Sequence, residues 1–164
     1  MNVKRIARLL QDKEQVIRET VLDKVQEKKI ILYGARSFNL QVPQRFRKKT
    51  SDYDLLSKKP RKTAKEIAET LKRRLEGKVT VEKAKHKGTY KIKINGEHII
   101  DVTQLKHIPK TKKVWGTEVK SLKSIKRSTQ RIVKKPSTEY RREKDIGTLD
   151  RIKRIEDIEK KFSF

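Results

Sequence analysis

Apolar residues recur along the first 25 positions at the spacing of one helix face, and charged residues fill the positions between them. The pattern predicts an amphipathic helix over residues 3–25. Its apolar positions are Val3, Ile6, Leu9, Leu10, Val16, Ile17, Val21 and Val25. The next apolar run, KKIILYG at residues 28–34, is short, rich in β-forming residues and closed by Gly34. It predicts a buried strand that enters a tight turn.

Strand and helix patterns then alternate. Residues 35–50 have no clear period and contain Pro43, so we expect a loop there. SDYDLLS, residues 51–57, predicts a second strand, and KVTVEKA, residues 78–84, predicts a third. Between these strands, residues 59–77 predict a helix that ends at a glycine. Its apolar face carries Ile67, Leu71 and Leu75.

The clearest local signal is a β-hairpin over residues 89–105, TYKIKINGEHIIDVTQL. Asn95-Gly96 is the dipeptide favoured in a two-residue hairpin turn. In the first arm, apolar residues alternate with lysines. In the second arm, alternation predicts that Ile100 and Val102 share one face. The other face of that arm would carry Ile99, Asp101 and Thr103.

The character of the chain changes after Leu105. Residues 106–135 contain eleven Lys or Arg and a single acid, Glu118. This basic segment predicts a short helix whose apolar face would carry Val119, Leu122, Ile125 and Ile132. A final helix is predicted over residues 137–164. The order helix, strand, loop, strand, helix, strand, hairpin, basic segment, helix predicts an α/β (α+β) fold, with a small mixed sheet flanked by helices.

Positive charge is the strongest feature of the composition. The 164 residues include 46 Lys and Arg against 21 Asp and Glu, a formal net charge of +25. A surface this positive attracts polyanions, so nucleic acid is the first candidate partner and an anionic membrane surface the second. No stretch has the apolar length of a membrane span or of a secretory signal. Since cysteine is also absent, we expect an intracellular, cytoplasmic protein, or one of the host cytoplasm or virion if the source is viral.

Two aspartates stand out against this basic background. Asp52 and Asp54 lie one residue apart in the strand predicted over residues 51–57, so their side chains would point to the same face. Two like charges that close oppose each other's ionisation unless a cation lies between them, and oxygen ligands suit Mg²⁺. Asp101 interrupts an apolar arm of the hairpin. It would complete a three-carboxylate metal cluster if the two strands are neighbours.

Each of these carboxylates also has an ordinary structural interpretation. Asp52 fits a turn or cap aspartate after Ser51, and Asp54 fits a solvated residue on an edge strand. Asp101 fits a salt bridge to one of the many lysines. Spacing alone does not decide between these interpretations and a metal site.

The segments LYGARS, RKKTSDYDLL and HIIDVTQL, in this order, resemble the DNA polymerase beta-like nucleotidyltransferase superfamily. That family has an apolar strand ending in Gly-Gly or Gly-Ser, then two carboxylates between apolar residues, then a third aspartate on a later strand. YGARSFN, EKAKHKGTYKIK and YRREKDIGTLDRI narrow the resemblance to small nucleotidyltransferases of archaea and large DNA viruses, some related to viral poly(A) polymerases. The resemblance covers residues 28–155.

The resemblance implies roles for individual residues. The catalytic carboxylates, which would hold Mg²⁺ or Mn²⁺, would be Asp52, Asp54 and Asp101. Gly34 would let the backbone approach a triphosphate, or would be an ordinary turn glycine. Ala35 departs from the family pattern, and the Ser37 hydroxyl would take the place of the missing one. Other candidates for contact with the nucleotide, which as surface residues could equally be solvated, are Arg36, Arg47 and Lys91.

The basic segment supplies candidate contacts to nucleic acid. They are Lys112, Lys113, Lys123, Lys126 and Arg127. Trp115 and Tyr140 could stack on bases, but burial in the core is the expectation we favour for both. Lys144 and Asp145 are expected to serve packing rather than catalysis.

The residues and the resemblance together predict a metal-dependent nucleotidyltransferase. It would move a nucleoside monophosphate from an NTP to an acceptor hydroxyl at the 3′ end of a nucleic acid, RNA or DNA, and release pyrophosphate. The alternatives are a non-catalytic nucleic-acid-binding protein on the same fold and a toxin-type enzyme that modifies tRNA or a protein. Residues 1–105 would form the catalytic core with its N-terminal helix. Residues 106–164 would form a basic segment and a C-terminal helix packed on the same domain.

Overall fold

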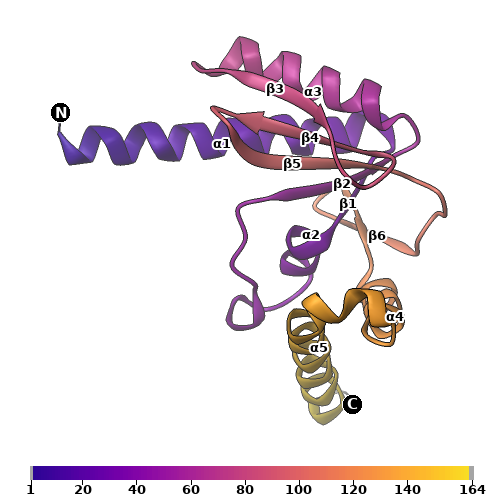
Figure 1. Cartoon of the computed structure of the whole chain (residues 1–164). Helices are drawn as coiled ribbons and strands as arrows, with labels where there is room; N and C mark the ends of the chain where they lie inside the picture. Colours follow the sequence, from indigo (N-terminus) through magenta and orange to yellow (C-terminus); the bar gives the residue numbers. More distant parts are fainter. Residues whose placement is uncertain (1, 163–164) are drawn as a thin grey trace.

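The computed structural model describes residues 2–162, apart from the side chains of residues 7, 8 and 28. Within that range, seven strands form one mixed sheet in the order β3-β4-β5-β2-β1-β7-β6 (Figure 1). The strands are β1 (Ile31–Tyr33), β2 (Tyr53–Ser57), β3 (Val79–Lys83), β4 (Thr89–Ile94), β5 (Glu97–Gln104), β6 (Thr111–Val114) and β7 (Thr117–Lys120). The helices are α1 (Val3–Lys28), α2 (Gly34–Leu40), α3 (Pro60–Arg74), α4 (Leu122–Val133) and α5 (Arg142–Phe162), with 3-10 turns η1 (Gln44–Phe46) and η2 (Pro136–Arg141). The predicted mixed sheet flanked by helices is confirmed.

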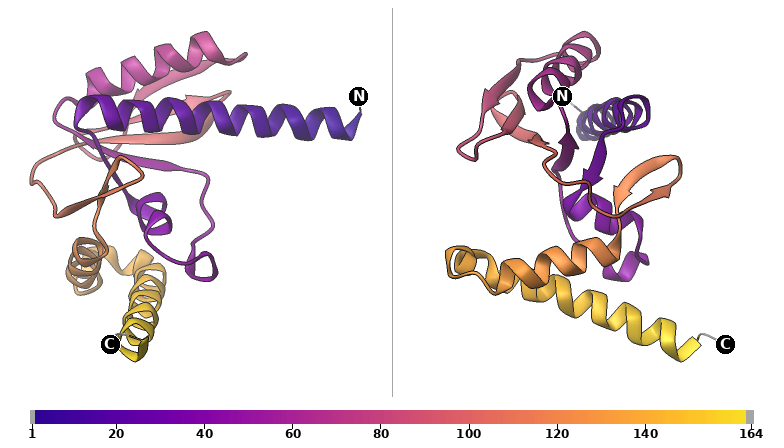
Figure 2. Two further views of the ribbon diagram at one scale, coloured as in Figure 1. Left: turned by 180° about the vertical axis from the view of Figure 1, so that it is seen from behind. Right: turned by 90° about the vertical axis from the view of Figure 1, so that its right-hand side faces the viewer.

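The main core lies between one face of the sheet and the helices α1 and α3 (Figure 2). α3 begins with Pro60, which is tolerated there because the first turn of a helix needs no N–H donor. Fully buried aliphatic side chains from the sheet, such as Leu55 and Ile100, belong to the same core as the buried side chains of α3. Each such side chain contributes about 1.5–3 kcal/mol. The buried side chains of α3 are Pro60, Thr63, Ala64, Ile67, Ala68 and Leu71.

α1 packs against the sheet through its C-terminal half only. Ile17, Val21 and Val25 are buried, whereas Val3 and Leu10 are exposed. The N-terminal turns extend well past the sheet in Figure 1. The predicted amphipathic helix is confirmed, and only part of its apolar face belongs to the core.

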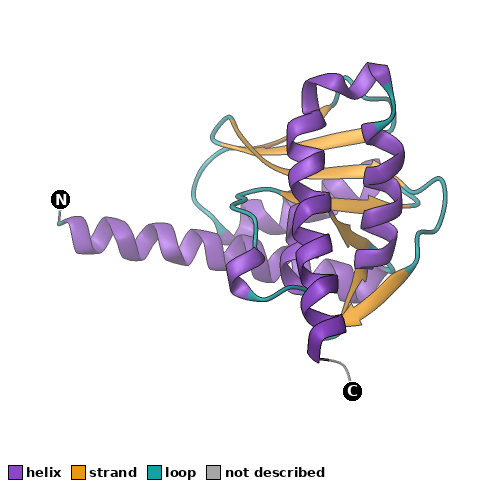
Figure 3. Ribbon diagram, turned by 90° about the horizontal axis from the view of Figure 1, so that it is seen from below, coloured by secondary structure: helices purple, strands orange, loops and turns teal. Residues whose placement is uncertain are grey.

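The opposite face of the sheet carries α2, which contacts β1, β2 and β7. α4 and α5 lie side by side below it (Figure 3). A second, smaller core joins α2 to these helices. It consists of Phe38, Val42, Ile125, Ile152 and Ile155. This core fixes the start of α5 relative to β1 and β2.

The loop predicted over residues 35–50 is wrong in its first part, because α2 occupies Gly34–Leu40. A helix of two turns offers too few apolar positions for a period to be recognised. Its inward face carries Phe38 and Ser37, and the Ser37 hydroxyl donates to the carbonyl of Lys120 in β7 at 2.8 Å. Polar contacts of this kind leave no signature in the hydrophobic pattern.

The hairpin predicted around the Asn-Gly turn is confirmed, with one correction. Ile99 is buried in the same core as Ile100, not on the opposite face. Ile92 lies opposite Ile100 while the next residue of β4 lies opposite His98, so Ile99 is the extra residue of a β-bulge. The bulge interrupts the alternation, and His98 consequently contacts Asp101 three residues further on.

The basic segment contains a second hairpin that the pattern did not predict. β6 and β7 pair antiparallel, and β7 also pairs with β1, so both strands extend the sheet beyond residue 105. Adjacent lysines in β6, Lys112 and Lys113, hide any alternation of apolar residues. The short helix predicted in this segment is confirmed as α4, but Val119, which was expected on its apolar face, belongs to β7. The domain division at residue 105 stays a prediction.

Further differences concern the end of α3, two aromatic residues and the last helix. α3 ends at Arg74 and not at the predicted glycine, because the backbone of Leu75 is already extended. Trp115 and Tyr140 are exposed, so their expected burial is wrong. α5 begins at Arg142, later than predicted, because the non-helical backbone of Thr138 keeps the preceding residues in the turn η2. The predicted end of this helix lies outside the described residues. Within residues 2–162, no helix has the length and apolarity to cross a membrane.

Candidate active site

Polar side chains line up across four strands on the sheet face opposite α1 and α3. Asp54 of β2 lies directly opposite Asp101 of β5 and, on its other side, opposite Tyr33 of β1. Lys91 of β4 lies opposite Asp101. Residues directly opposite on neighbouring strands point to the same face, so the four form one row. Asp52 lies just before β2 begins, and its negative charge is near enough to raise the pKa of Asp54.

The environment of Asp54 opposes its ionisation. Burial, then the negative charges of Asp101 and Asp52, raise the pKa of Asp54 from 3.8 to about 6, and Lys144 acts against them. Burial also raises the pKa of Tyr33 to about 12, and Asp54 and Asp101 add to that rise. A chain with a large excess of positive charge therefore concentrates negative charge at this point.

None of the three carboxylates forms an ion pair with Lys or Arg among the described residues, although the chain has 46 of them. Asp101 instead has His98 beside it, with Nε2 2.8 Å from Oδ1. The salt bridge to a lysine that would have explained Asp101 structurally is not there in this part of the chain. Ser51 Oγ donates to Asp52 Oδ1 at 3.1 Å, which is the contact of a turn aspartate.

The carboxylates suit a divalent metal because of their chemistry, although their side chains do not form a complete coordination site. The described part of the chain holds no group of three or more acidic, histidine or cysteine side chains already gathered around one ion position. Asp54 and Asp101 are adjacent, hard oxygen donors, which Mg²⁺ and Mn²⁺ prefer. A divalent cation would relieve the repulsion that raises the pKa of Asp54. The donor set therefore fits such an ion.

Gly34 follows β1 at this site and lies against Asp54. Its φ of +68° is in the left-handed region that favours glycine. A Cβ atom built there would lie 2.3 Å from Asp54 Oδ2 and 3.0 Å from its Cγ. The position of the carboxylate thus requires a residue without a side chain.

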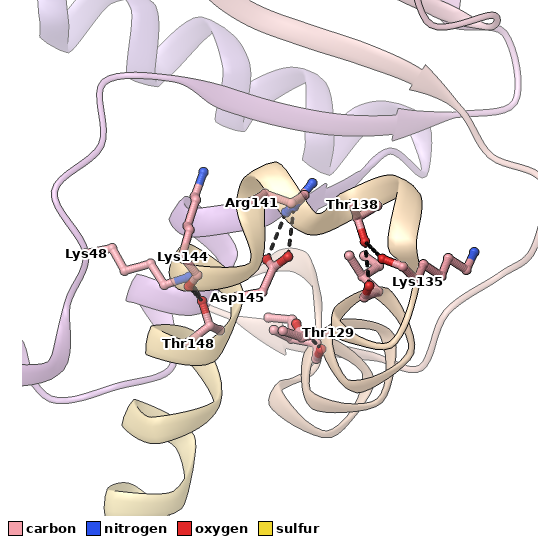
Figure 4. Close-up of polar contacts among 10 residues, drawn as sticks. Lys48, Thr129, Lys135, Thr138, Arg141, Lys144, Asp145 and Thr148 are labelled. Atoms are coloured by element: carbon pink, nitrogen blue, oxygen red, sulfur yellow. Dashed lines mark hydrogen bonds and ion pairs between the residues drawn. The ribbon is translucent and has the colours of Figure 1, made fainter.

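Positive charge faces the carboxylates from the end of η2 and the start of α5. Figure 4 shows Arg141 and Lys144 there, with Lys48 from the loop between α2 and β2 beside them. Lys144 is near enough to lower the pKa of Asp54, and Arg141 near enough to lower that of Tyr33. Carboxylates on the sheet and cations on the helix together suit a polyphosphate that carries a metal ion.

Hydrogen bonds hold two of these cations, Arg141 and Lys48, in place (Figure 4). Arg141 donates from two nitrogens to the two oxygens of the buried Asp145, at 2.9 and 3.1 Å. Lys48 donates to Thr148 Oγ1, and burial with nearby positive charges lowers the pKa of Lys48 to about 8. The packing role expected for Asp145 is confirmed, whereas Lys144 is exposed and the packing role expected for it is wrong.

The other residues predicted to touch a nucleotide lie in different surroundings. Arg36 on α2 donates from Nε to the carbonyl of Asp52 at 3.2 Å, so it borders the carboxylates. Lys91 belongs to the polar row. Arg47 is exposed in the loop before β2. Ser37 is fully buried, and its hydroxyl is engaged in attaching α2 to β7.

The predicted nucleic-acid contacts fall on two separate elements. Lys126 on α4 donates to both carboxylate oxygens of Glu156 on α5, at 2.8 and 2.9 Å, so its charge is engaged within the protein. The other four are exposed: Lys112 and Lys113 on β6, and Lys123 and Arg127 on α4.

The sequence patterns did not predict a place at this site for His98, Tyr33 or the cations Arg141 and Lys144. Strict alternation places His98 and Asp101 on opposite faces, so only a signal for the bulge would have joined them. Arg141 belongs to the quoted segment YRREKDIGTLDRI, and that resemblance was the one signal available for it.

The raised pKa of Asp54 predicts a pH-dependent stability for the metal-free protein. The native state favours the protonated carboxyl, so this stabilisation is present below about pH 4 and is lost as the pH rises through about 6. Asp54→Asn should match the wild type in free energy of unfolding at about pH 4 and exceed it by about 2 kcal/mol at about pH 8. Urea unfolding without divalent ions measures both values.

The matched control for this experiment is Asp150→Asn, because Asp150 is an exposed carboxylate on α5. This variant should show no change in the stability difference between the two pH values. Equal stability of Asp54→Asn and the wild type at the higher pH would contradict the assignment of a destabilising charge to Asp54.

Comparisons with known proteins bear on the family and the fold. The family described as poly(A) polymerase catalytic subunit matches residues 19–134. The polyadenylate synthase of Megavirus has a similar structure, with a TM-score of 0.73 and 22% sequence identity. The match covers 85% of this chain but only 30% of the Megavirus protein. JHP933 from Helicobacter pylori matches with a TM-score of 0.53 and 11% identity over 87% of this chain and 64% of that protein. No curated protein matches the sequence significantly.

Proposed function

Because the chain belongs to the poly(A) polymerase catalytic subunit family, we propose that it transfers nucleotides from ATP to the 3′ end of RNA. The 3′ oxygen of the RNA attacks the α-phosphorus of ATP and forms a phosphodiester bond. The bond from the α-phosphorus to the oxygen that bridges it to the β-phosphate breaks, and pyrophosphate leaves. The hydroxyl proton passes to a base on the protein. Nucleotidyltransferase chemistry is the property of the family, while the nucleotide and acceptor for this chain are our proposal.

The observation that carries this proposal is the pairing of Asp54 with Asp101 across β2 and β5. In a chain with 46 Lys and Arg, these half-buried acids have no Lys or Arg ion pair among the described residues. Repulsion between them is a stability cost that a purely structural role does not explain. Phosphoryl transfer does explain it, since it depends on positioning and on charge neutralisation.

Mg²⁺ or Mn²⁺ is the cofactor that these donors fit. Asp54 and Asp101 would hold it, with Asp52 as the third ligand. When bound, such an ion lowers the pKa of the attacking hydroxyl and neutralises charge on the leaving phosphates.

The residues of the chain would position the nucleotide and handle the proton. Arg141 and Lys144 face the carboxylates and would contact the β- and γ-phosphates, as charge-assisted donors do in other phosphate sites. Asp101 would accept the proton of the 3′ hydroxyl. His98, 2.8 Å from Asp101, would receive that proton and pass it to solvent.

Primer extension tests this proposal directly. The protein is incubated with a labelled RNA primer, each NTP in turn, and Mg²⁺ or Mn²⁺, and the products are separated by length. We expect extension with ATP that stops when the divalent ion is chelated. A folded protein that binds RNA but extends no RNA or DNA primer with any NTP would instead be a non-catalytic binding protein.

Exposed cations should give RNA binding a strong salt dependence. Each lysine that contacts a phosphate of a single strand adds about 0.7 to the magnitude of the slope of log K against log salt concentration. Replacing Lys112, Lys113 and Lys123 by Gln should therefore lower that magnitude by about 2. Filter binding at several salt concentrations measures the slope.

Lys126→Gln is the matched control, because the Lys126 ammonium is engaged by Glu156. We expect its slope to stay close to that of the wild type. A triple variant with the wild-type slope would show that RNA binds elsewhere.

A further inference from the structure

The tip of the β6–β7 hairpin presents a tryptophan in an unusual state. Trp115 is 91% exposed. Its backbone also adopts a positive φ of +52°, which is uncommon for a bulky side chain. A large apolar surface in water and a strained backbone are both unfavourable for folding. Their combination at one residue points to a role outside the folded core.

A second hairpin turn with glycine in the same position shows what this turn would ordinarily contain. Asn95-Gly96, between β4 and β5, has φ values of +51° and +82°. Trp115-Gly116 has φ values of +52° and +75°, which is nearly the same conformation. Asn-Gly is the preferred sequence for such a turn. Trp115 therefore occupies a position that asparagine fills with less strain.

The surroundings of Trp115 are basic. Lys112 and Lys113 precede it on the exposed edge strand β6, and Lys106 and Lys110 are exposed on the segment leading to that strand. A Cβ on Gly116 would lie 3.7 Å from Gln26 Nε2, so the turn rests against the end of α1. The indole thus stands on a supported turn beside clustered positive charge.

We propose that Trp115 is a stacking platform for an unpaired base, and that the lysines of β6 hold the flanking phosphates of single-stranded RNA. Aromatic side chains beside a cationic track are the usual means of binding single strands, because every base has a stackable face. Duplex RNA buries its base faces and offers nothing for the indole to stack on. Naming RNA as the ligand rests on the proposed function, whereas the stacking surface itself does not.

The position of the hairpin suits the body of the RNA rather than its reacting end. β7 runs parallel to β1, with Val119 opposite Leu32. The tip therefore lies beyond the start of β1, while Gly34 and Asp54 lie at its other end. Five residues along these strands and two strand spacings across the sheet put Trp115 about 20 Å from Asp54. An RNA held at Trp115 would need to extend that far to place its 3′ end at the site.

Trp115 is the one tryptophan in the sequence, so its fluorescence reports on this surface alone. Titration with a single-stranded RNA oligonucleotide should quench the emission and reach its end point at the concentration that saturates filter binding. A duplex with the same number of phosphates should bind while leaving the emission largely unquenched. Saturating single-stranded RNA without quenching would overturn the proposal.

Two variants separate stacking from folding. Trp115→Asn should bind single-stranded RNA about ten-fold more weakly. Its Tm should not fall, because asparagine suits the turn better. Trp115→Phe keeps an aromatic ring and should retain most of the affinity. RNA affinity unchanged in Trp115→Asn, or lost equally in both variants, would overturn the proposal.

Two further measurements separate this surface from the active site and from membranes. Asp54→Asn should show the same quenching of Trp115 fluorescence as the wild type. Loss of nucleotide transfer with this quenching retained would show that the variant leaves the stacking surface intact. Wild-type protein that quenches normally but transfers no nucleotide would reject only the proposed function. Anionic phospholipid vesicles should leave the emission unchanged. A blue shift with vesicles and no response to RNA would mean that the hairpin binds membranes instead.

Discussion

Asp54→Asn and Asp101→Asn will each abolish measurable nucleotide transfer, lowering the rate by about 10³-fold or more. The two carboxylates lie opposite each other on β2 and β5, so loss of either removes one of the two adjacent charged ligands proposed for the divalent ion. The fold should survive, since relief of repulsion at Asp54 removes an unfavourable charge. Primer extension and circular dichroism on the same samples measure both effects.

Asp150→Asn is the control for these variants as well, because it removes one exposed carboxylate far from the polar row in sequence. It should retain the wild-type rate. Binding of RNA should be unchanged in all three variants, since the exposed cations remain. If either active-site variant transfers nucleotides at the wild-type rate, the carboxylate pair is not catalytic.

Gly34→Ala will lower transfer by about 100-fold, because the added Cβ must displace the Asp54 carboxylate and small displacements of reacting groups cost rates of this order. The ideal Cβ lies 2.3 Å from Asp54 Oδ2, a distance that real Cβ atoms do not adopt. The positive φ at this residue adds about 1–2 kcal/mol of strain. Tm and transfer rate, measured side by side, report the two effects.

Gly96→Ala separates strain from collision. Gly96 has a φ of +82° but no atom within 4 Å of an added Cβ, so this variant should lose stability without losing transfer. Gly34→Ala in an Asp54→Ala background should be less destabilising than Gly34→Ala alone, because the colliding carboxylate is gone. Full activity of Gly34→Ala would show that the carboxylate can move without consequence.

Local patterns predicted much of this fold. Alternating Tyr90, Ile92 and Ile94 with an Asn-Gly turn specify a hairpin within 17 residues, and the helical spacing in α3 specifies which side is buried. The closeness of the Asp52 charge to Asp54 follows from their spacing alone. These features depend on neighbours in sequence, which is why the sequence was sufficient for them.

Long-range arrangements were not predictable from local patterns. The pairing of Asp54 with Asp101 joins residues 47 positions apart. The residues suggested it only on the condition that the two strands are neighbours, and the family resemblance was the one signal for that condition. The cations Arg141 and Lys144 reach the site because the second core orients α5, and no periodicity encodes that. The expected burial of Trp115 is wrong because hydrophobicity favours burial, while the adjacent lysines of β6 leave no apolar alternation to reveal the turn.

The most direct test of the account measures the products of a single reaction. Wild-type protein, Mg²⁺ or Mn²⁺, ATP labelled at the α-phosphate and an RNA primer are combined, and labelled RNA and pyrophosphate are both quantified. The account predicts one pyrophosphate released for each nucleotide joined, with neither product from a primer that lacks its 3′ hydroxyl. Label joined to RNA with the 3′ end blocked, or no labelled RNA from folded protein that binds the primer, would contradict it.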